Sequence, residues 1–250
     1  MKDENNKLKL NKMNKQIETK RKNDIKEVRM SGDYVLTTGK DQDTVLEIYS
    51  FSKLNLVESL NIGEIQNVHM KVTPDDKFIV ISTYMYELAV VELLRNKKFN
   101  HTSLIDEEFL KTQRLKSIGG IKVHISDYDF SNDNRFFIVS SEDGSVKVFH
   151  NHGNISSSTI LTDFSVKKEI NNAEKVTLYV DEFDKGHLKG LIALSNEGDI
   201  YVCDADGKQR GMFKKAHDTT IMTLKIAKEG NNFLLVSGSR DGKFHVHKLN

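Results

Sequence analysis

The sequence contains no tryptophan, and its 250 residues include one proline, Pro74, and one cysteine, Cys203. A single cysteine excludes a disulfide within the chain and favours a reducing compartment. No apolar run approaches the roughly 20 residues that a helix needs to cross a bilayer, and the N-terminus lacks the apolar stretch of a secretory signal. We therefore expect a globular protein of the cytoplasm that does not itself span a membrane.

A net charge of one sign is also missing, because 37 Lys and Arg nearly balance 36 Asp and Glu. This balance gives no overall case for nucleic-acid binding. Residues 1–30 nevertheless hold ten basic and five acidic residues, a local charge of about +5. Residues 1–23 combine Lys and Asn with few apolar residues, so we expect a mobile basic arm. Contact of this arm with RNA or the ribosome is an alternative function.

The signatures of common enzyme families are absent as well. The chain has no G-x-S-x-G, P-loop, G-x-G-x-x-G or H-E-x-x-H sequence. His150 with His152, and His245 with His247, have a spacing that suits metal ligands on an extended strand. Neither pair has a cysteine or a third histidine nearby in the sequence. We therefore expect no catalytic residue, no metal and no cofactor.

From residue 24 onward, short apolar runs alternate with turns rich in Gly, Asp and Asn. Each pair of runs predicts a β-hairpin. Helical periodicity is confined to a stretch in the arm and to residues 106–116, where we expect a helix. The remainder predicts an all-β chain. The five hairpins fall at residues 34–49, 78–91, 136–149, 191–203 and 233–247.

The hairpins recur at a regular interval along the chain. Their last residues are spaced by 42, 58, 54 and 44 positions. The shorter spacings match the period of about 40–45 residues of a four-stranded propeller blade, and the longer ones leave room for inserted loops. We therefore predict a β-propeller domain over residues 24–250 with five recognisable four-stranded blades.

Closure of such a propeller needs a further strand, because the last hairpin is followed by three residues only. Residues 7–10, Lys-Leu-Lys-Leu, alternate with the period of a strand and are a candidate for this role. The other expectation is an open arc whose exposed edge is covered by a partner.

Several motifs resemble those of WD-repeat proteins. Residues 141–149 and 239–247 resemble a nine-residue WD-repeat motif that begins with Ser-x-Asp-Gly and has tryptophan as its last residue. Residues 72–75 and 130–133 stand where that family has its Phe-Ser-Pro-Asp turn. The chain thus resembles the WD-repeat β-propeller family, whose members are mostly scaffolds for protein–protein interaction. The positions of the family's tryptophan are occupied here by Tyr49, Val91, Phe149, Cys203 and His247.

Residues 32–50, 66–74 and 123–149 are similar to the later blades of the transducin beta-like protein 2 branch of that family. The branch has seven blades behind an N-terminal membrane anchor, and neither the anchor nor the earliest blades are seen here. This resemblance implies an adaptor associated with the endoplasmic reticulum, in stress signalling or translation control.

The resemblance also implies a buried relay of hydrogen bonds in the last blade. In WD blades, a histidine before the first strand, a hydroxyl in the second, the turn aspartate and the tryptophan take part. The implied relay consists of His217, Ser237 or Ser239, Asp241 and His247, and Asp143 is the corresponding turn residue of the third blade. A structural role is expected for all of them, because a catalytic triad also needs an oxyanion hole.

Propellers bind partners mostly through the loops at one end of their blades. Tyr84, Met85 and Tyr86 form an aromatic tip of the kind enriched at interfaces, and Arg240 is a second candidate. The alternative for the aromatic residues is packing against the neighbouring blade. We therefore predict a non-catalytic scaffold that binds protein partners through these loops.

Overall fold

The computed structural model describes residues 25–39, 45–61, 67–83, 88–92, 112–115, 124–152, 158–165 and 173–249. The regular structure in these residues consists of β-strands, which confirms the predicted all-β class. The strands are β1 (Ile25–Ser31), β2 (Tyr34–Gly39), β3 (Val45–Ser50), β4 (Asn55–Asn61), β5 (Asn67–Val72), β6 (Phe78–Thr83), β7 (Leu88–Glu92), β8 (Thr112–Leu115), β9 (Ile125–Phe130), β10 (Phe136–Ser141), β11 (Ser145–His150), β12 (Thr159–Ser165), β13 (Lys175–Asp184), β14 (His187–Asn196), β15 (Asp199–Asp204), β16 (Gln209–Phe213), β17 (Ile221–Glu229), β18 (Asn232–Ser239) and β19 (Phe244–Leu249).

The strands form five antiparallel sheets, in each of which neighbours along the chain pair with one another. We number them sheet 1 (β1–β4), sheet 2 (β5–β8), sheet 3 (β9–β12), sheet 4 (β13–β16) and sheet 5 (β17–β19). The five predicted hairpins are the second and third strands of these sheets. Sheet 5 has three strands among the described residues, whereas each of the other sheets has four.

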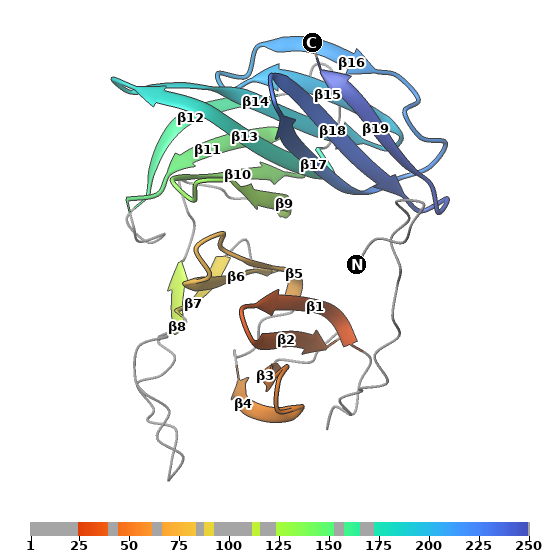
Figure 1. Cartoon of the computed structure of the whole chain (residues 1–250). Helices are drawn as coiled ribbons and strands as arrows, with labels where there is room; N and C mark the ends of the chain where they lie inside the picture. Colours follow the sequence, from red (N-terminus) through yellow and green to blue (C-terminus); the bar gives the residue numbers. More distant parts are fainter. Residues whose placement is uncertain are drawn as a thin grey trace.

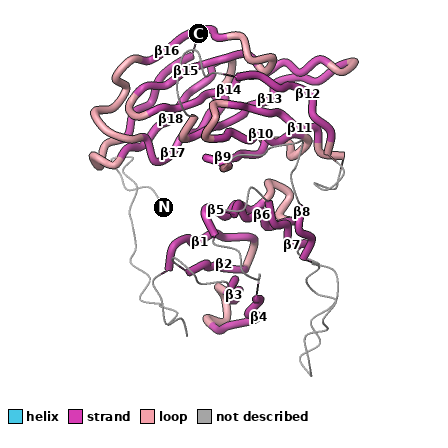
Figure 2. The backbone as a smooth tube through the Cα atoms, turned by 180° about the vertical axis from the view of Figure 1, so that it is seen from behind, coloured by secondary structure: helices cyan, strands magenta, loops and turns pink. Residues whose placement is uncertain are grey.

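The sheets follow one another in chain order along an open arc (Figures 1 and 2). The first strands of successive sheets are neighbours, since β1 contacts β5, β9 contacts β13, and β13 contacts β17. Within the described part of the chain, no strand of sheet 5 pairs with a strand of sheet 1. The arrangement is therefore a row of antiparallel sheets that is not closed into a ring, and it does not confirm a number of propeller blades.

The prediction of a helix near residues 106–116 is wrong for the part of this range that the structure describes. Thr112–Leu115 forms strand β8 and pairs antiparallel with β7. Backbone pairing with an existing strand edge outweighs a weak local helical pattern, because tertiary context regularly overrides propensity. The expected helix and strand of the arm lie outside the described residues.

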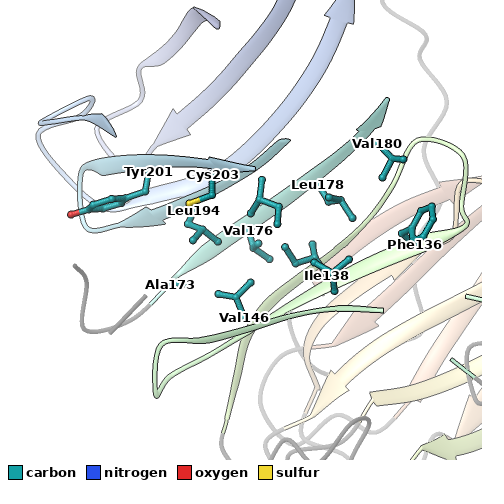
Figure 3. Packing of buried hydrophobic residues seen from close by; sticks show 12 residues of the cluster. Phe136, Ile138, Val146, Ala173, Val176, Leu178, Val180, Leu194, Tyr201 and Cys203 are labelled. Carbon is teal, nitrogen blue, oxygen red and sulfur yellow. The ribbon is translucent and has the colours of Figure 1, made fainter. Parts of the chain in front are cut away.

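Apolar side chains from facing sheets form a separate core at each junction between sheets. Figure 3 shows the junction of sheets 3 and 4, where Ile138 and Val146 face Val176 and Leu178. Burial of a side chain of this size contributes about 1.5–3 kcal/mol. The junctions therefore hold the arc together. The buried members of this core are Phe136, Ile138, Val146, Val148, Ala173, Val176, Leu178, Val180, Ile192, Leu194, Tyr201 and Cys203.

The turn between the first two strands has the same construction in sheets 2 and 3. The Thr73 hydroxyl donates to Asp75 Oδ1 at 2.7 Å, and the Ser131 hydroxyl donates to Asp133 Oδ1 at 2.7 Å. Both hydroxyls also accept the backbone N–H of the phenylalanine that begins the next strand. The two turns occupy the positions at which the sequence predicted equivalent turns.

Candidate protein-interaction site

The turns between second and third strands lie beside the loops that lead into first strands. Backbone hydrogen bonds join them: Glu142 N–H donates to His124 O at 2.9 Å, and Ile221 N–H donates to Glu197 O at 3.0 Å. The first bond joins the β10–β11 turn to the loop that leads into β9 within sheet 3, and the second joins the β14–β15 turn of sheet 4 to the start of β17 in sheet 5. We refer to residues 141–145, 196–199, 214–220 and 239–243 as the rim.

Two turns of the rim are built on an Asp-Gly pair. Asp143 Oδ1 accepts the N–H of Ser145 at 2.9 Å, and Asp241 Oδ1 accepts the N–H of Lys243 at 2.9 Å. The glycine that follows each aspartate has a φ of 76° or 79°, a left-handed conformation that favours glycine. Both aspartates therefore fix the shape of their turn. Asp143 has no further side-chain partner among the described residues.

Two residues of the implied relay, His217 and Ser237, contact each other close to the Asp241 turn. His217 is buried, and its Nε2 lies 2.8 Å from the Ser237 hydroxyl. The His217 ring stacks on His245, with 4.4 Å between ring centroids. Neither His217 Nδ1 nor Asp241 Oδ2 has a hydrogen-bond partner in the described part of the chain. The structure thus joins histidine and serine directly and leaves the aspartate outside this hydrogen bond.

The other implied members occupy different places. The Ser239 hydroxyl lies 2.7 Å from the Thr219 hydroxyl and so joins its turn to the loop before β17. The His247 ring lies against Phe213 of sheet 4, with centroids 4.3 Å apart, where the WD pattern has tryptophan. Ser239 therefore stabilises the rim, and His247 packs between two sheets.

Burial shapes the electrostatics of this cluster. Burial is the main cause that lowers the pKa of His217 and of His247, and the nearby His245 lowers both further. Asp241 raises the pKa of His217 by a smaller amount, while Lys243 lowers it and Asp218 raises it. Both imidazoles are therefore held in the neutral form more strongly than in water.

We expect acid to destabilise sheet 5. Because the folded-state pKa values of His217 and His247 lie below 6.5, the unfolded chain takes up protons first as the pH falls through about 6.5. Stability present at neutral pH is therefore lost below that value. Urea unfolding between pH 7.5 and 5.5 measures this loss. His247→Gln should reduce the slope, and equal slopes in the variant and the wild-type protein would contradict the assignment.

Asp241→Ala is expected to destabilise sheet 5. The change removes the hydrogen bond that Lys243 N–H donates to Asp241 Oδ1, in a turn that lies beside His217 and His245. The melting temperature should fall by a few degrees. Asp143→Ala is the matched control, since it removes the same bond from a turn without such a cluster. Thermal unfolding followed by circular dichroism compares the two. An unchanged melting curve for Asp241→Ala would remove the structural role assigned to this carboxylate.

The structure describes only some of the residues that the sequence analysis predicted to contact partners. Arg240 is exposed at the tip of its turn, and its backbone N–H donates to Thr220 O at 3.1 Å. Tyr84, Met85 and Tyr86 lie outside the described residues. Arg240 is therefore the candidate contact residue that the structure positions.

The first strands of sheets 2, 3 and 5 carry an ionic network that the sequence analysis did not identify. Lys71 Nζ of β5 lies 3.2 Å from Asp127 Oδ1 and 3.8 Å from Asp129 Oδ1, and it donates to Tyr128 O. Lys225 Nζ of β17 lies 2.6 Å from Asp129 Oδ2. We call these four charged side chains the central network.

The central network also binds sheet 4. The Thr177 hydroxyl of β13 donates to Asp129 Oδ2 at 2.7 Å, and Val176 N–H donates to Asp127 Oδ2 at 3.1 Å. Burial raises the pKa of Asp127, but the charges of Lys71 and Lys175 outweigh it, so that this pKa is lowered overall. Asp127 therefore stays ionised and joins three sheets. The network supports the fold and is not exposed at the rim.

Within the described ranges, no group of three or more His, Cys, Asp and Glu side chains is arranged to hold a metal ion. The rings of His150 and His152 lie 4.2 Å apart between centroids and are tilted by 51°. No helix in the described part of the chain has the length and apolar character required to cross a bilayer.

A comparison with known families finds a match to part of the chain. Residues 115–150 match the family described as WD domain, G-beta repeat. The matched segment runs from the last residue of β8 through β9, β10 and β11, and it includes the Asp143 turn. A search of curated proteins found none that matches the chain. The chain therefore carries a segment that matches a WD40 repeat at residues 115–150, and this match supports its resemblance to WD-repeat proteins.

Proposed function

We propose that this protein is a non-catalytic WD-repeat scaffold that binds protein partners through its rim. The observation that carries the proposal is the WD40 repeat at residues 115–150, whose Asp143 turn lies in the rim. WD40 repeats commonly mediate protein interactions. In this proposal the sheets are blades of a propeller-like arc that presents the rim to partners.

The geometry of the rim suits this role. Arg240 is exposed, and its turn is held by the Thr219–Ser239 hydroxyl contact and by the Lys243–Asp218 ion pair at 3.4 Å. Because the turn is already held, its backbone loses little conformational freedom on binding, and arginine is enriched among residues that dominate interface energetics. Arg240 is the proposed anchor.

A tagged full-length chain, used to isolate partners from its native cell, tests the proposal. Arg240→Glu should reduce recovery of specific partners at least tenfold. Lys208→Glu is the matched control, because Lys208 is also exposed but lies in the turn between β15 and β16, at the opposite end of sheet 4. Equal recovery with both variants would contradict a role for the rim.

Two finer assignments rest on sequence alone. The endoplasmic-reticulum setting, with stress signalling or translation control, follows from resemblance to the transducin beta-like protein 2 branch. RNA or ribosome contact through residues 1–23 follows from their charge, and these residues lie outside the described ones. Deletion of residues 1–23, and isolation at low and high salt, separate the two. Partners lost under both changes would assign binding to the arm.

A further inference from the structure

Sheet 5 differs from the other four sheets at its outer side. In sheets 1 to 4 the third strand is paired on both sides, because a fourth strand follows it and completes the sheet. Strand β19 pairs with β18 alone among the described residues, and it forms one side of sheet 5 in Figure 1. The side of β19 that faces away from β18 is therefore the place where sheet 5 lacks the fourth strand of the repeat.

This edge of β19 presents backbone hydrogen-bonding groups. Ser239 N–H donates to Lys243 O at 3.0 Å across the turn that joins β18 to β19. The backbone groups of successive residues in a strand point to opposite sides, so the N–H and C=O of Phe244, Val246 and Lys248 point away from β18. Strand edges of this kind accept an extended peptide as a further strand through main-chain hydrogen bonds.

The same three residues of β19 have exposed side chains. Phe244 is 74% exposed, Val246 is 54% exposed, and Lys248 is also exposed. Val146 and Val148 of β11 follow their Asp-Gly turn at the same distances, and both are fully buried in the core to which the outer strand β12 contributes. An outer strand on β19 would thus cover apolar surface as well as pair with the backbone.

The four outer strands that the structure describes indicate which residue type belongs opposite Phe244. In each of them a large apolar residue pairs with the third-strand residue that corresponds to Phe244. These pairs are Leu60 with Leu46, Leu115 with Leu88, Phe164 with Val146, and Phe213 with Ile200. The outer-strand residues two positions earlier are polar or glycine, namely Glu58, Gln113, Thr162 and Gly211. A segment that completes sheet 5 therefore needs one large apolar residue, opposite Phe244.

Charge favours an acidic segment at this edge. Residues 214–249, which form sheet 5 and the loop before it, contain seven basic and three acidic residues, a net charge of +4, whereas the whole chain carries +1. Strands β18 and β19 contain no acidic residue. Residues 1–23 contain eight basic and three acidic residues, so the arm has the same sign of charge as sheet 5 and is disfavoured as the occupant.

We propose that the edge of β19 binds an acidic, extended segment of a partner protein as a fourth, antiparallel strand of sheet 5. The backbone of the segment pairs with the outward N–H and C=O groups of β19. A large apolar residue of the segment lies against Phe244, and its acidic residues lie near Lys243 and Lys248, at the two ends of the strand. This edge is a second binding surface, and it does not rest on the role proposed for Arg240.

A fluorescent peptide of sequence Glu-Glu-Thr-Thr-Thr-Phe-Glu, titrated with the full chain and followed by fluorescence anisotropy, tests the proposal. It has one large apolar residue and glutamates at both ends. Binding should saturate and should weaken with added salt. A peptide with lysine in place of every glutamate should bind about tenfold more weakly. Lys248→Glu should weaken binding of the acidic peptide, whereas Lys53→Glu, at an exposed turn residue of sheet 1, is the matched control and should not.

Two methylated peptides test the strand pairing itself. Methylation of the phenylalanine nitrogen removes the N–H that faces β19 and should reduce affinity about tenfold. Methylation of the nitrogen of the threonine before it is the matched control, because that N–H points away from β19. Equal affinities of the two methylated peptides, or no saturable binding of the acidic peptide, would overturn the proposal.

Amide hydrogen exchange of the full chain distinguishes the other occupants. Without peptide, the outward N–H groups of Phe244 and Val246 should exchange fast, and they should become protected when the acidic peptide is added. His245 and His247, whose backbone groups face β18, should be protected throughout. Protection of Phe244 and Val246 without peptide in dilute protein would assign the edge to another segment of the same chain. Protection that grows with protein concentration would assign it to a second copy, and either result would overturn the proposal.

Discussion

Replacement of Asp129 by alanine is expected to lower the free energy of unfolding by about 3 kcal/mol. Its carboxylate accepts from the buried Thr177 hydroxyl at 2.7 Å and pairs with Lys225 at 2.6 Å, so the change removes this partner from one buried donor of sheet 4 and one half-exposed donor of sheet 5. The loss should be near the low end for a broken buried pair, because Lys225 is half-exposed and Lys71 keeps Asp127 at 3.2 Å. Urea unfolding measures it.

Asp163→Ala is the matched control for this prediction. Asp163 pairs with Lys147 at 2.5 Å, but its side chain is 52% exposed. Exposed ion pairs contribute at most about 1 kcal/mol, since water replaces the lost partner. Asp129→Ala should also speed amide exchange in β13 and β17, which Asp163→Ala should not. Equal loss of stability in both variants would show that the central network contributes no more than a surface pair.

The hairpins could be predicted from sequence because their signals are local. A run such as residues 136–141 has β-branched and aromatic residues, and the Asp143–Gly144 turn that follows fixes its own geometry. The position of β8 could not be predicted in the same way. Its four residues, Thr112–Leu115, become a strand by pairing with β7, and no local pattern specifies that pairing.

Equivalence in sequence also did not imply equivalence in structure at the two Asp-Gly turns. Both aspartates bind the backbone of their own turn. In sheet 5 the second strand, β18, carries Ser237, and the hydroxyl of Ser237 contacts His217. At the same register position in β10 of sheet 3 the residue is Val139, which has no hydroxyl. A relay implied by resemblance therefore depends on partners from other strands, and Asp143 lacks them in the described residues.

The central network was missed because its residues are far apart in the chain. Asp127 and Asp129 alternate with Tyr128, and this pattern alone indicates a strand with one polar face turned to water. The structure instead turns that face toward Lys71, 56 residues earlier than Asp127, and Lys225, 96 residues later than Asp129. The sequence signal for these ion pairs was the presence of opposite charges on the first strands of different repeats. That signal identifies the partners once the arrangement of the sheets is known.

Gly198→Ala is expected to destabilise the protein by about 3 kcal/mol, the upper part of the usual range for an overpacked site. A Cβ at this position would lie 2.0 Å from the backbone oxygen of His217, which is too close for any contact. His217 N–H also donates to Gly198 O at 3.0 Å, so the loop cannot move away without losing this bond. The displaced loop would separate His217 from Ser237. Thermal unfolding and the exchange rate of the His217 amide measure both effects.

Gly211→Ala in β16 separates this steric effect from the general consequence of replacing a glycine. A Cβ at Gly211 meets nothing within 4 Å, and alanine restricts the unfolded chain more than glycine does. This control should therefore be neutral or slightly stabilising. If Gly198→Ala were as stable as Gly211→Ala, the loop before β17 could not be held against the turn between β14 and β15. The rim would then lack the rigidity that positions Arg240 for a partner.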